Sequence, residues 1–171
     1  MSDVIFDTST VNEALDRLAQ AMKQDEVVNL IGIQRGGAEV ADALQARLER
    51  DGVTVQRGNL DISFYRDDLD TIGANPEVRP SHLPFNLTDQ QIWLVDDVLY
   101  TGRTIRAALG ELFDYARPAG VHLAVLLDRG GRELPITANE TGLKHETEPG
   151  CSVKLITDDS GWYIEQRQVQ S

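Results

Sequence analysis

The first half of the chain alternates between helical and strand-like patterns of hydrophobic residues. Residues 10–23 carry apolar side chains at intervals of three and four, which predicts an amphipathic helix with Ser9 or Thr10 as its N-cap. An apolar run at 27–33 predicts a buried strand, and helical spacing returns over 38–50. This order of strand, turn and helix predicts the first half of a crossover unit.

The second half of the chain repeats this alternation of patterns. Alternating strands and helices predict an α/β fold with a mostly parallel central sheet flanked by helices. The predicted elements are strands at 53–64, 92–95 and 120–127, a helix at 105–115 and a C-terminal hairpin at about 152–165. Between the first two of these strands, periodicity is lost over about residues 67–84, and a segment of that length in a compact domain predicts a functional loop.

Composition limits the class of protein. A chain of 171 residues, 41% of them hydrophobic, is expected to form a single domain over residues 1–171. The single cysteine, Cys151, rules out an internal disulfide and fits a reducing cytoplasm. No apolar run approaches the roughly 20 residues that span a bilayer, so we expect a cytoplasmic protein with no membrane partner. The net charge of −12 argues against a general nucleic-acid binder.

The strongest candidate site follows the predicted strand at 92–95. The first backbone N–H groups of a helix have no partner within it, so Gly102 and the hydroxyls of Thr101 and Thr104 predict a phosphate cup. The adjacent carboxylates of Asp96 and Asp97 would repel phosphate. We expect them to face sugar hydroxyls or a hydrated Mg²⁺. A phosphate cup beside an acidic pair predicts a site for a ribose 5-phosphate.

A second candidate loop, Gln34, Arg35 and Gly36, follows the strand at 27–33. Exposed backbone N–H groups and a forked guanidinium favour an anion there, and the alternative is a helix-start turn with a solvated arginine. A third loop, at residues 128–136, follows the strand at 120–127. Because ligands bind at the carboxyl ends of parallel strands, we expect the three loops to lie side by side.

Three segments resemble a known family. Residues 95–104, V-D-D-V-L-Y-T-G-R-T, are similar to the phosphoribosyl pyrophosphate motif of type I phosphoribosyltransferases. The Leu-Tyr within them resembles the PyrR family of pyrimidine-operon regulators, which also have uracil phosphoribosyltransferase activity. Residues 65–69, Y-R-D-D-L, and residues 128–136, D-R-G-G-R-E-L-P-I, resemble further motifs of that family. Without the resemblance, the alternative is an ordinary strand, turn and helix.

The resemblance implies the type I phosphoribosyltransferase fold, with a small hood and a flexible loop at about 67–84 that closes over the donor. It also implies Mg²⁺ as cofactor, and for the third loop the alternative is a salt-bridged turn or a subunit contact. The implied catalytic residues are Asp96, Asp97, Arg35 and Arg66; the implied substrate-binding residues are Val98, Leu99, Tyr100, Thr101, Gly102, Arg103, Thr104, Gln34, Gly36, Arg129 and Arg132; and Asp128 is implied to bind the metal through water.

The implied reaction transfers a phosphoribosyl group from 5-phosphoribosyl 1-pyrophosphate to uracil, giving UMP and pyrophosphate. Purine-specific relatives tend to carry an aspartate where this chain has Tyr100, so a pyrimidine acceptor is favoured. A purine or orotate acceptor is the alternative. The family also implies a homodimer or a homotetramer.

RNA is a further partner that the resemblance implies. Attenuating members of the family carry arginines in the first helix, where this chain has only Arg17 and Lys23 as basic residues. They also carry basic residues where Thr137 and Glu140 stand here. We therefore expect uracil phosphoribosyltransferase activity as the main function. The alternative is a UMP-sensing, RNA-binding attenuator of pyrimidine biosynthesis genes with weak or no catalysis.

Overall fold

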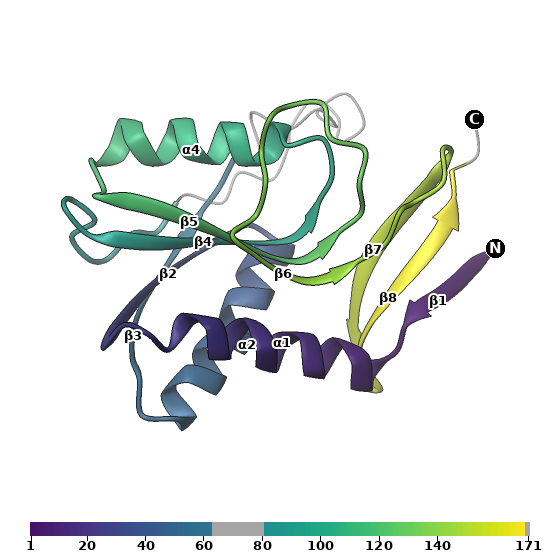
Figure 1. Ribbon diagram of the computed structural model, residues 1–171, viewed down its shortest axis with the longest axis horizontal. Coiled ribbons are helices and arrows are strands. Elements are labelled where there is room, and N and C mark those ends of the chain that lie inside the picture. Colours follow the sequence, from purple (N-terminus) through teal and green to yellow (C-terminus); the bar gives the residue numbers. More distant parts are fainter. Residues whose placement is uncertain (63–80, 170–171) are drawn as a thin grey trace.

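The chain forms a larger sheet covered by helices and a smaller sheet beside it (Figure 1). The structure is a computed structural model that describes residues 1–62 and 81–169. Its elements are β1 (Ser2–Phe6), α1 (Thr8–Met22), β2 (Val27–Ile33), α2 (Gly36–Arg50), β3 (Thr54–Leu60), β4 (Gln91–Leu99), α4 (Arg103–Tyr115), β5 (Gly120–Asp128), β6 (Glu140–Lys144), β7 (Cys151–Asp158) and β8 (Gly161–Gln168).

The larger sheet is parallel and has the strand order β3-β2-β4-β5-β6 within the described residues. Helices α1 and α2 cover one face and α4 covers the other (Figure 1), which confirms the predicted α/β class. After β2 the chain moves outward to β3 and then returns to place β4 on the other side of β2. The carboxyl ends of β2 and β4 therefore form a topological switch point, where ligands bind in open α/β sheets.

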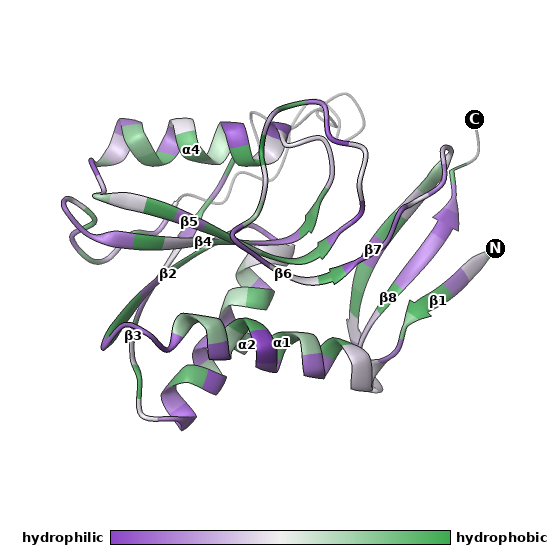
Figure 2. Cartoon of the chain, in the orientation of Figure 1, coloured by the Kyte–Doolittle hydropathy of each residue, from purple (hydrophilic) through white to green (hydrophobic). Residues whose placement is uncertain are grey.

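Two apolar layers hold the helices to the sheet. Successive residues of a strand face opposite sides, so Leu30 of β2 packs in the layer beneath α1 and α2, whereas Ile31 packs in the layer beneath α4. Leu18 of α1 and Leu112 of α4 are buried in these two layers. Figure 2 shows hydrophobic and hydrophilic residues alternating along α1 and α2, as expected of helices with one buried face.

Helix α1 begins earlier than its hydrophobic spacing predicts. Its N-cap is Asp7, not Ser9 or Thr10, and the Asp7 carboxylate accepts a hydrogen bond of 2.9 Å from the Thr10 N–H. Aspartate is a strong N-cap residue because its side-chain oxygen satisfies one of the first helical N–H groups. The predicted caps were wrong because the apolar pattern starts only at Val11, one turn into the helix.

Strand β4 runs past the two carboxylates that were expected to end it. The prediction placed its end at Val95, but the pairing with β5 continues through Asp96 to Leu99. The two acids are accommodated because each carboxylate accepts the N–H of the next residue, Asp97 or Val98. The loop that follows β4 therefore begins at Tyr100, four residues later than predicted.

The smaller sheet is antiparallel and has the strand order β1-β8-β7. Strands β7 and β8 form the hairpin at the C-terminal end, and β1 adds to its open edge. This sheet lies beside the carboxyl ends of β5 and β6 (Figure 1), where Arg129 donates a hydrogen bond to the Cys151 carbonyl oxygen. His145 contacts Gln166 in the same region. The smaller sheet therefore occupies the place expected for a small hood.

Some predictions concern residues that the structure does not describe. Arg66, the motif at 65–69 and most of the loop at about 67–84 lie outside the described residues.

Two strands of the structure were not predicted from the sequence. Strands β1 and β6 were missed because each is short and partly exposed and lacks a clear alternation of hydrophobic and polar residues. No helix in the part of the chain that the structure describes is long and apolar enough to cross a membrane.

We expect Asp7→Ala to lower the melting temperature at neutral pH, because it removes the acceptor for the Thr10 N–H. That hydrogen bond holds the pKa of Asp7 below its ordinary value. The stabilisation is therefore present above the ordinary aspartate pKa and is lost as the pH falls through the depressed value in the folded state. Thermal unfolding of both proteins over a descending pH series should show the two melting temperatures converging in acid.

The matched control is Asp7→Asn, whose amide oxygen keeps the cap but does not titrate. Its melting temperature at neutral pH should stay closer to that of the unmodified protein than the alanine variant does. A deficit of Asp7→Ala that is the same at every pH would contradict this account of the cap.

Candidate functional site

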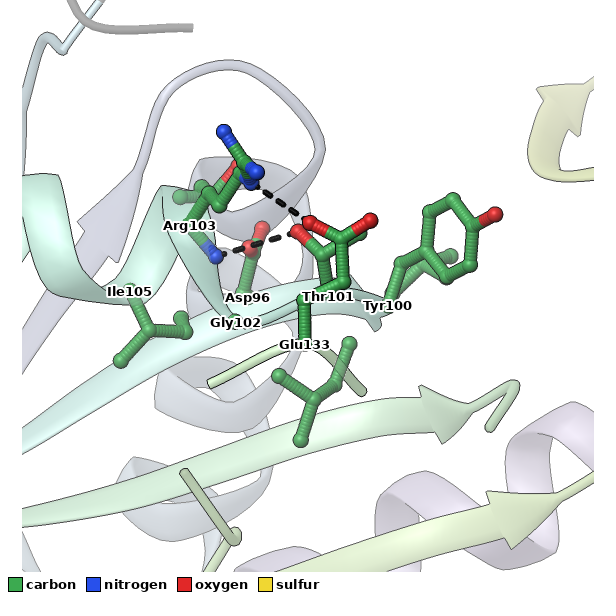
Figure 3. Close-up of a pocket in the computed structure, with 10 residues that line it drawn as sticks. Asp96, Tyr100, Thr101, Gly102, Arg103, Ile105 and Glu133 are labelled. Atoms are coloured by element: carbon green, nitrogen blue, oxygen red, sulfur yellow. Dashed lines mark hydrogen bonds and ion pairs between the residues drawn. The ribbon is translucent and has the colours of Figure 1, made fainter. Parts of the chain in front are cut away.

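A cavity of about 600 Å³ opens at the carboxyl end of β4 and the start of α4 (Figure 3). Its position at the switch point agrees with the expected place of a ligand. The lining residues are Asp96, Val98, Leu99, Tyr100, Thr101, Gly102, Arg103, Thr104, Ile105 and Glu133. The structure thus brings the whole predicted segment 98–104 to one cavity, together with one of the two predicted carboxylates.

The start of α4 faces this cavity because Gly102 turns the chain sharply. Gly102 is the N-cap, and its φ of 93° lies in the left-handed region that favours glycine. An added Cβ there would lie 3.3 Å from side-chain atoms of Leu134 and Ile136. The N–H of Arg103 bonds to the Thr101 hydroxyl at 3.2 Å. The turn therefore presents the helix N-terminus and two threonines to the cavity, which is the arrangement that binds a phosphate.

The two carboxylates of β4 are held in place by the backbone. Asp96 is 5% exposed, and its Oδ1 accepts the N–H of Asp97 at 2.9 Å. The Oδ1 of Asp97 accepts the N–H of Val98 at 2.8 Å. Each carboxylate is thus fixed close to its own main chain, so both can accept hydrogen bonds from sugar hydroxyls without first being ordered.

The glycine loop after β2 lies against these carboxylates. A Cβ on Gly36 would lie 2.0 Å from Asp97 Oδ2, and one on Gly37 would lie 3.1 Å from Asp96 Oδ1 and 2.4 Å from the Val95 carbonyl oxygen. The peptide bond between Gln34 and Arg35, in the same loop, is cis. The first two predicted loops therefore meet, and they meet only because glycine has no side chain at these positions.

The third loop is held together by Arg132. Its guanidinium contacts the Asp128 carboxylate at 2.6 Å and also donates to the carbonyl oxygen of Tyr100. Burial alone would raise the pKa of Asp128. Hydrogen bonds from Arg132 and the Gly130 N–H, with the charges of Arg132 and Lys144, outweigh burial and lower the pKa. Asp128 therefore stays ionised, and the loop has the salt-bridged form that was its alternative interpretation.

Arg129 supports the ring of Tyr100 from behind. Arg129 is only 9% exposed, and its guanidinium carbon lies 3.8 Å from the centroid of the Tyr100 ring, within the range of a cation–π contact. A Cβ on Gly131 would lie 2.5 Å from Tyr100 Cε2, so the ring also packs against that glycine. Tyr100 is still 48% exposed. It therefore forms a supported aromatic wall beside the cavity.

Sequence reasoning missed two residues of the cavity, Ile105 and Glu133. Figure 3 shows the Glu133 and Arg103 side chains pointing toward one another, and Glu133 Oε2 lies 2.7 Å from Arg103 Nε. Glu133 is thirty residues from its partner, so no helical or strand period links the two positions. Only its place in the third family-like motif could have drawn attention to it.

The other predicted site residues that the structure describes are not in the lining of this cavity. Gly36 and Asp97 form the contact between the loop after β2 and the end of β4, and Gln34 and Arg35 belong to the same loop. Asp128, Arg129 and Arg132 belong to the turn behind Tyr100. Among residues 1–62 and 81–169, no group of three or more His, Cys, Asp or Glu side chains is placed to hold a metal ion. A metal bound by these residues would need further ligands, such as water or a substrate.

The chain matches known proteins over most of its length. The Phosphoribosyl transferase domain model matches residues 2–163. The chain is 46% identical over 171 residues to the Bifunctional protein PyrR of Deinococcus radiodurans, and this match covers 94% of this chain and 92% of that protein. It is 46% identical over 143 residues to the Bifunctional protein PyrR of Akkermansia muciniphila, and this match covers 82% of this chain and 81% of that protein.

The fold is similar to that of solved structures. A hypoxanthine-guanine phosphoribosyltransferase from Bacillus anthracis superposes with a TM-score of 0.68 and covers 85% of this chain and 84% of that chain. Its sequence identity is 19%. At that identity the likeness concerns the fold, which is the predicted type I phosphoribosyltransferase fold.

The contact between Gly36 and Asp97 can be tested with Gly36→Ala. The added methyl group would overlap Asp97 Oδ2, so the carboxylate or the loop must move. We expect the affinity for ribose 5-phosphate with Mg²⁺, measured by isothermal titration calorimetry, to fall on the order of tenfold or more. A folded variant with unchanged affinity would show that the loop and the carboxylate do not act together.

The matched control for this substitution is Gly110→Ala on α4. Nothing lies within 4 Å of a Cβ at that exposed position. Its affinity should equal that of the unmodified protein, and its stability should rise by roughly 0.5–1 kcal/mol because alanine is favoured over glycine in a helix.

Proposed function

Because the chain belongs to the phosphoribosyl transferase family, and within it to the PyrR family, we propose that it is a uracil phosphoribosyltransferase of the bifunctional PyrR type. In this reaction the bond between ribose C1 and pyrophosphate breaks, a bond from C1 to uracil N1 forms, and the N1 proton leaves. The products are UMP and pyrophosphate. The observation that carries the proposal is the cavity in which the start of α4 meets Asp96 at the switch point.

We propose that the 5-phosphate of the donor binds at the start of α4. The helix N-terminus is positive, and the backbone N–H groups and hydroxyls of Thr101 and Thr104 supply directed donors to phosphate oxygens. Val98 and Leu99 form the apolar floor beside them. This anchor is remote from the reacting C1 atom, so its binding energy positions the ribose for reaction.

In the proposed complex, the ribose hydroxyls lie on Asp96 and Asp97. Both carboxylates are already oriented by backbone N–H groups, so no ordering cost arises when the sugar binds. The reacting ribose develops positive charge as pyrophosphate departs. Two nearby negative carboxylates stabilise that charge more strongly than they stabilise the neutral sugar, which lowers the barrier.

We propose that the leaving pyrophosphate binds at the loop Gln34, Arg35 and Gly36, because that loop meets the acid pair and carries a guanidinium that can bind phosphate oxygens. Arg129 and Arg132 are already bound to Tyr100 and to the third loop, so we assign them the support of that wall. Arg66 remains a candidate for the donor loop.

The cofactor implied by the fold is Mg²⁺. The described donor set suits it, because Mg²⁺ keeps several waters and uses one or two carboxylates with substrate phosphates, so a closed cage of side chains is not required. Asp128, kept ionised by Arg132, would contact it through water, and Asp97 lies on the ribose side. When bound, the ion neutralises charge that develops on the pyrophosphate.

We propose that Tyr100 forms one side of the base site. It is the exposed aromatic residue next to the cavity, and the cation behind its ring and the contact with Gly131 fix its orientation. A fixed wall favours a small planar acceptor such as uracil over a larger purine. Competition among uracil, orotate and purine bases decides the acceptor.

A second candidate function is the UMP-sensing RNA attenuator, which the word Bifunctional in the relatives' names supports. The basic residues of α1 and its C-cap have partners within the protein, which argues against a free RNA-binding face there. Arg17 donates to the Gly142 carbonyl oxygen at 2.7 Å, and Lys23 contacts Asp51 at 2.5 Å. Any RNA-binding surface must therefore use other residues. We accordingly propose uracil phosphoribosyltransferase activity as the main function and RNA attenuation as the second candidate.

An assay with uracil, 5-phosphoribosyl 1-pyrophosphate and Mg²⁺ tests the proposed function by measuring UMP formation. We expect turnover in the unmodified protein and a loss on the order of a hundredfold in Asp97→Asn, because the charge that stabilises the ribosyl cation is removed. The exposed Asp114 of α4 gives a matched control, since Asp114→Asn makes the same chemical change away from the site.

Thermal unfolding must show that both variants are folded. No UMP formation by the unmodified protein, together with tight UMP binding, would leave only the sensor. Unchanged turnover in Asp97→Asn would remove that carboxylate from the site.

A further inference from the structure

We propose that Glu133 is a positioning residue that weakens the binding of phosphorylated ligands. It would do so by holding the Arg103 guanidinium and by placing a negative charge beside the phosphate cup. The inference rests on the proposed function, since it concerns the same cavity, and it adds a control on affinity that the cup and the acid pair do not supply.

The contact that carries the inference lies at the first residue of α4. Arg103 Nε is 2.7 Å from Glu133 Oε2, and both side chains line the cavity that contains Thr101 and Thr104 (Figure 3). Arg103 is the cation of the cup segment, and its Nε donates to a carboxylate. A phosphate that binds here must share that guanidinium with Glu133 or replace it as the acceptor.

Glu133 is attached to the cup by its own backbone. The N–H groups of Glu133 and Leu134 both donate to the Thr101 carbonyl oxygen at 3.0 Å. The carboxylate therefore starts from a fixed point next to the phosphate loop, unlike a surface glutamate at the end of an unrestrained segment. Its negative charge therefore lies beside the proposed phosphate site.

Stability alone does not account for the pair. The side chains of Arg103 and Glu133 are 53% and 52% exposed, and exposed ion pairs contribute little to folding because water and salt screen them. A phosphate dianion in the same cavity feels the charge of Glu133 at short range. The pair therefore acts more strongly on the ligand than on the fold.

The repulsion between the Glu133 carboxylate and a bound phosphate affects substrate and product alike. The donor and UMP both carry a 5-phosphate, so a contact that weakens phosphate binding weakens both. Weaker product binding favours the release of UMP after the reaction. Glu133 thus sets how long a phosphorylated ligand stays in the cup.

The test compares the affinities of Glu133→Gln and the unmodified protein for ribose 5-phosphate and for UMP by isothermal titration calorimetry. Glutamine keeps the shape and removes the charge. We expect binding of both ligands to tighten by about three- to tenfold at low ionic strength. The gain should shrink at about 0.5 M salt, because screening reduces the repulsion that the glutamate exerts.

A structural role for Glu133 predicts the opposite sign. If the carboxylate merely held Arg103 in its binding position, its removal would weaken both ligands. Glu133→Ala, which removes the carboxylate together with the rest of the side chain beyond Cβ, should also tighten binding, as the glutamine variant does. Melting temperatures establish that each variant is folded.

Glu111→Gln is the matched control, because it makes the same charge change on α4, about two turns beyond Arg103. Its affinities should equal those of the unmodified protein. Unchanged or weaker binding by Glu133→Gln overturns the inference, as does an equal gain in Glu111→Gln. Failure of the unmodified protein to bind ribose 5-phosphate would contradict the proposed function as well, whereas binding without a gain in Glu133→Gln overturns this inference alone.

Discussion

The close contact between the end of β4 and the loop after β2 is the constraint on which the site depends. Two consecutive glycines, Gly36 and Gly37, allow the start of α2 to approach within van der Waals distance of Asp96 and Asp97. Any Cβ at Gly36 would occupy the space of the Asp97 carboxylate. The parallel order of the strands places this contact at the switch point, so the sheet itself decides where the two loops meet.

The same contact divides the site into regions of different charge. On one side, the positive N-terminus of α4 and its hydroxyls form a cup for an anion. The other partner in the contact is the loop after β2, which carries Arg35. In the proposed complex the ribose lies on the carboxylates, with its 5-phosphate at the cup and its pyrophosphate at that loop. Neither loop alone specifies that ligand.

Much of the larger sheet could be predicted because its elements bury one face or both. Leu30 and Ile31 illustrate this, since adjacent apolar residues that face opposite layers identify a fully covered strand. Strands β1 and β6 could not be predicted, because their partly exposed residues owe their conformation to pairing with distant strands. The length of β4 was also missed, since the local hydrogen bonds that accommodate Asp96 within a strand leave no trace in hydrophobic spacing.

The site divides in the same way between local and distant contacts. Residues 98–104 could be predicted because a single turn makes their arrangement a property of adjacent positions. The ion pair of Arg103 with Glu133 and the stacking of Arg129 on Tyr100 join segments about thirty residues apart, so only the folded chain reveals them. The hydrogen bond from Arg132 to the Tyr100 carbonyl oxygen joins positions 32 residues apart and was missed for the same reason.

A crystal structure of the protein with bound ribose 5-phosphate tests the central claim most directly. The account predicts phosphate oxygens within hydrogen-bonding distance of the backbone N–H groups and hydroxyls of residues 101–104, and ribose hydroxyls on Asp96 and Asp97. A ligand whose phosphate lies away from the start of α4, or whose hydroxyls contact neither carboxylate, would contradict it.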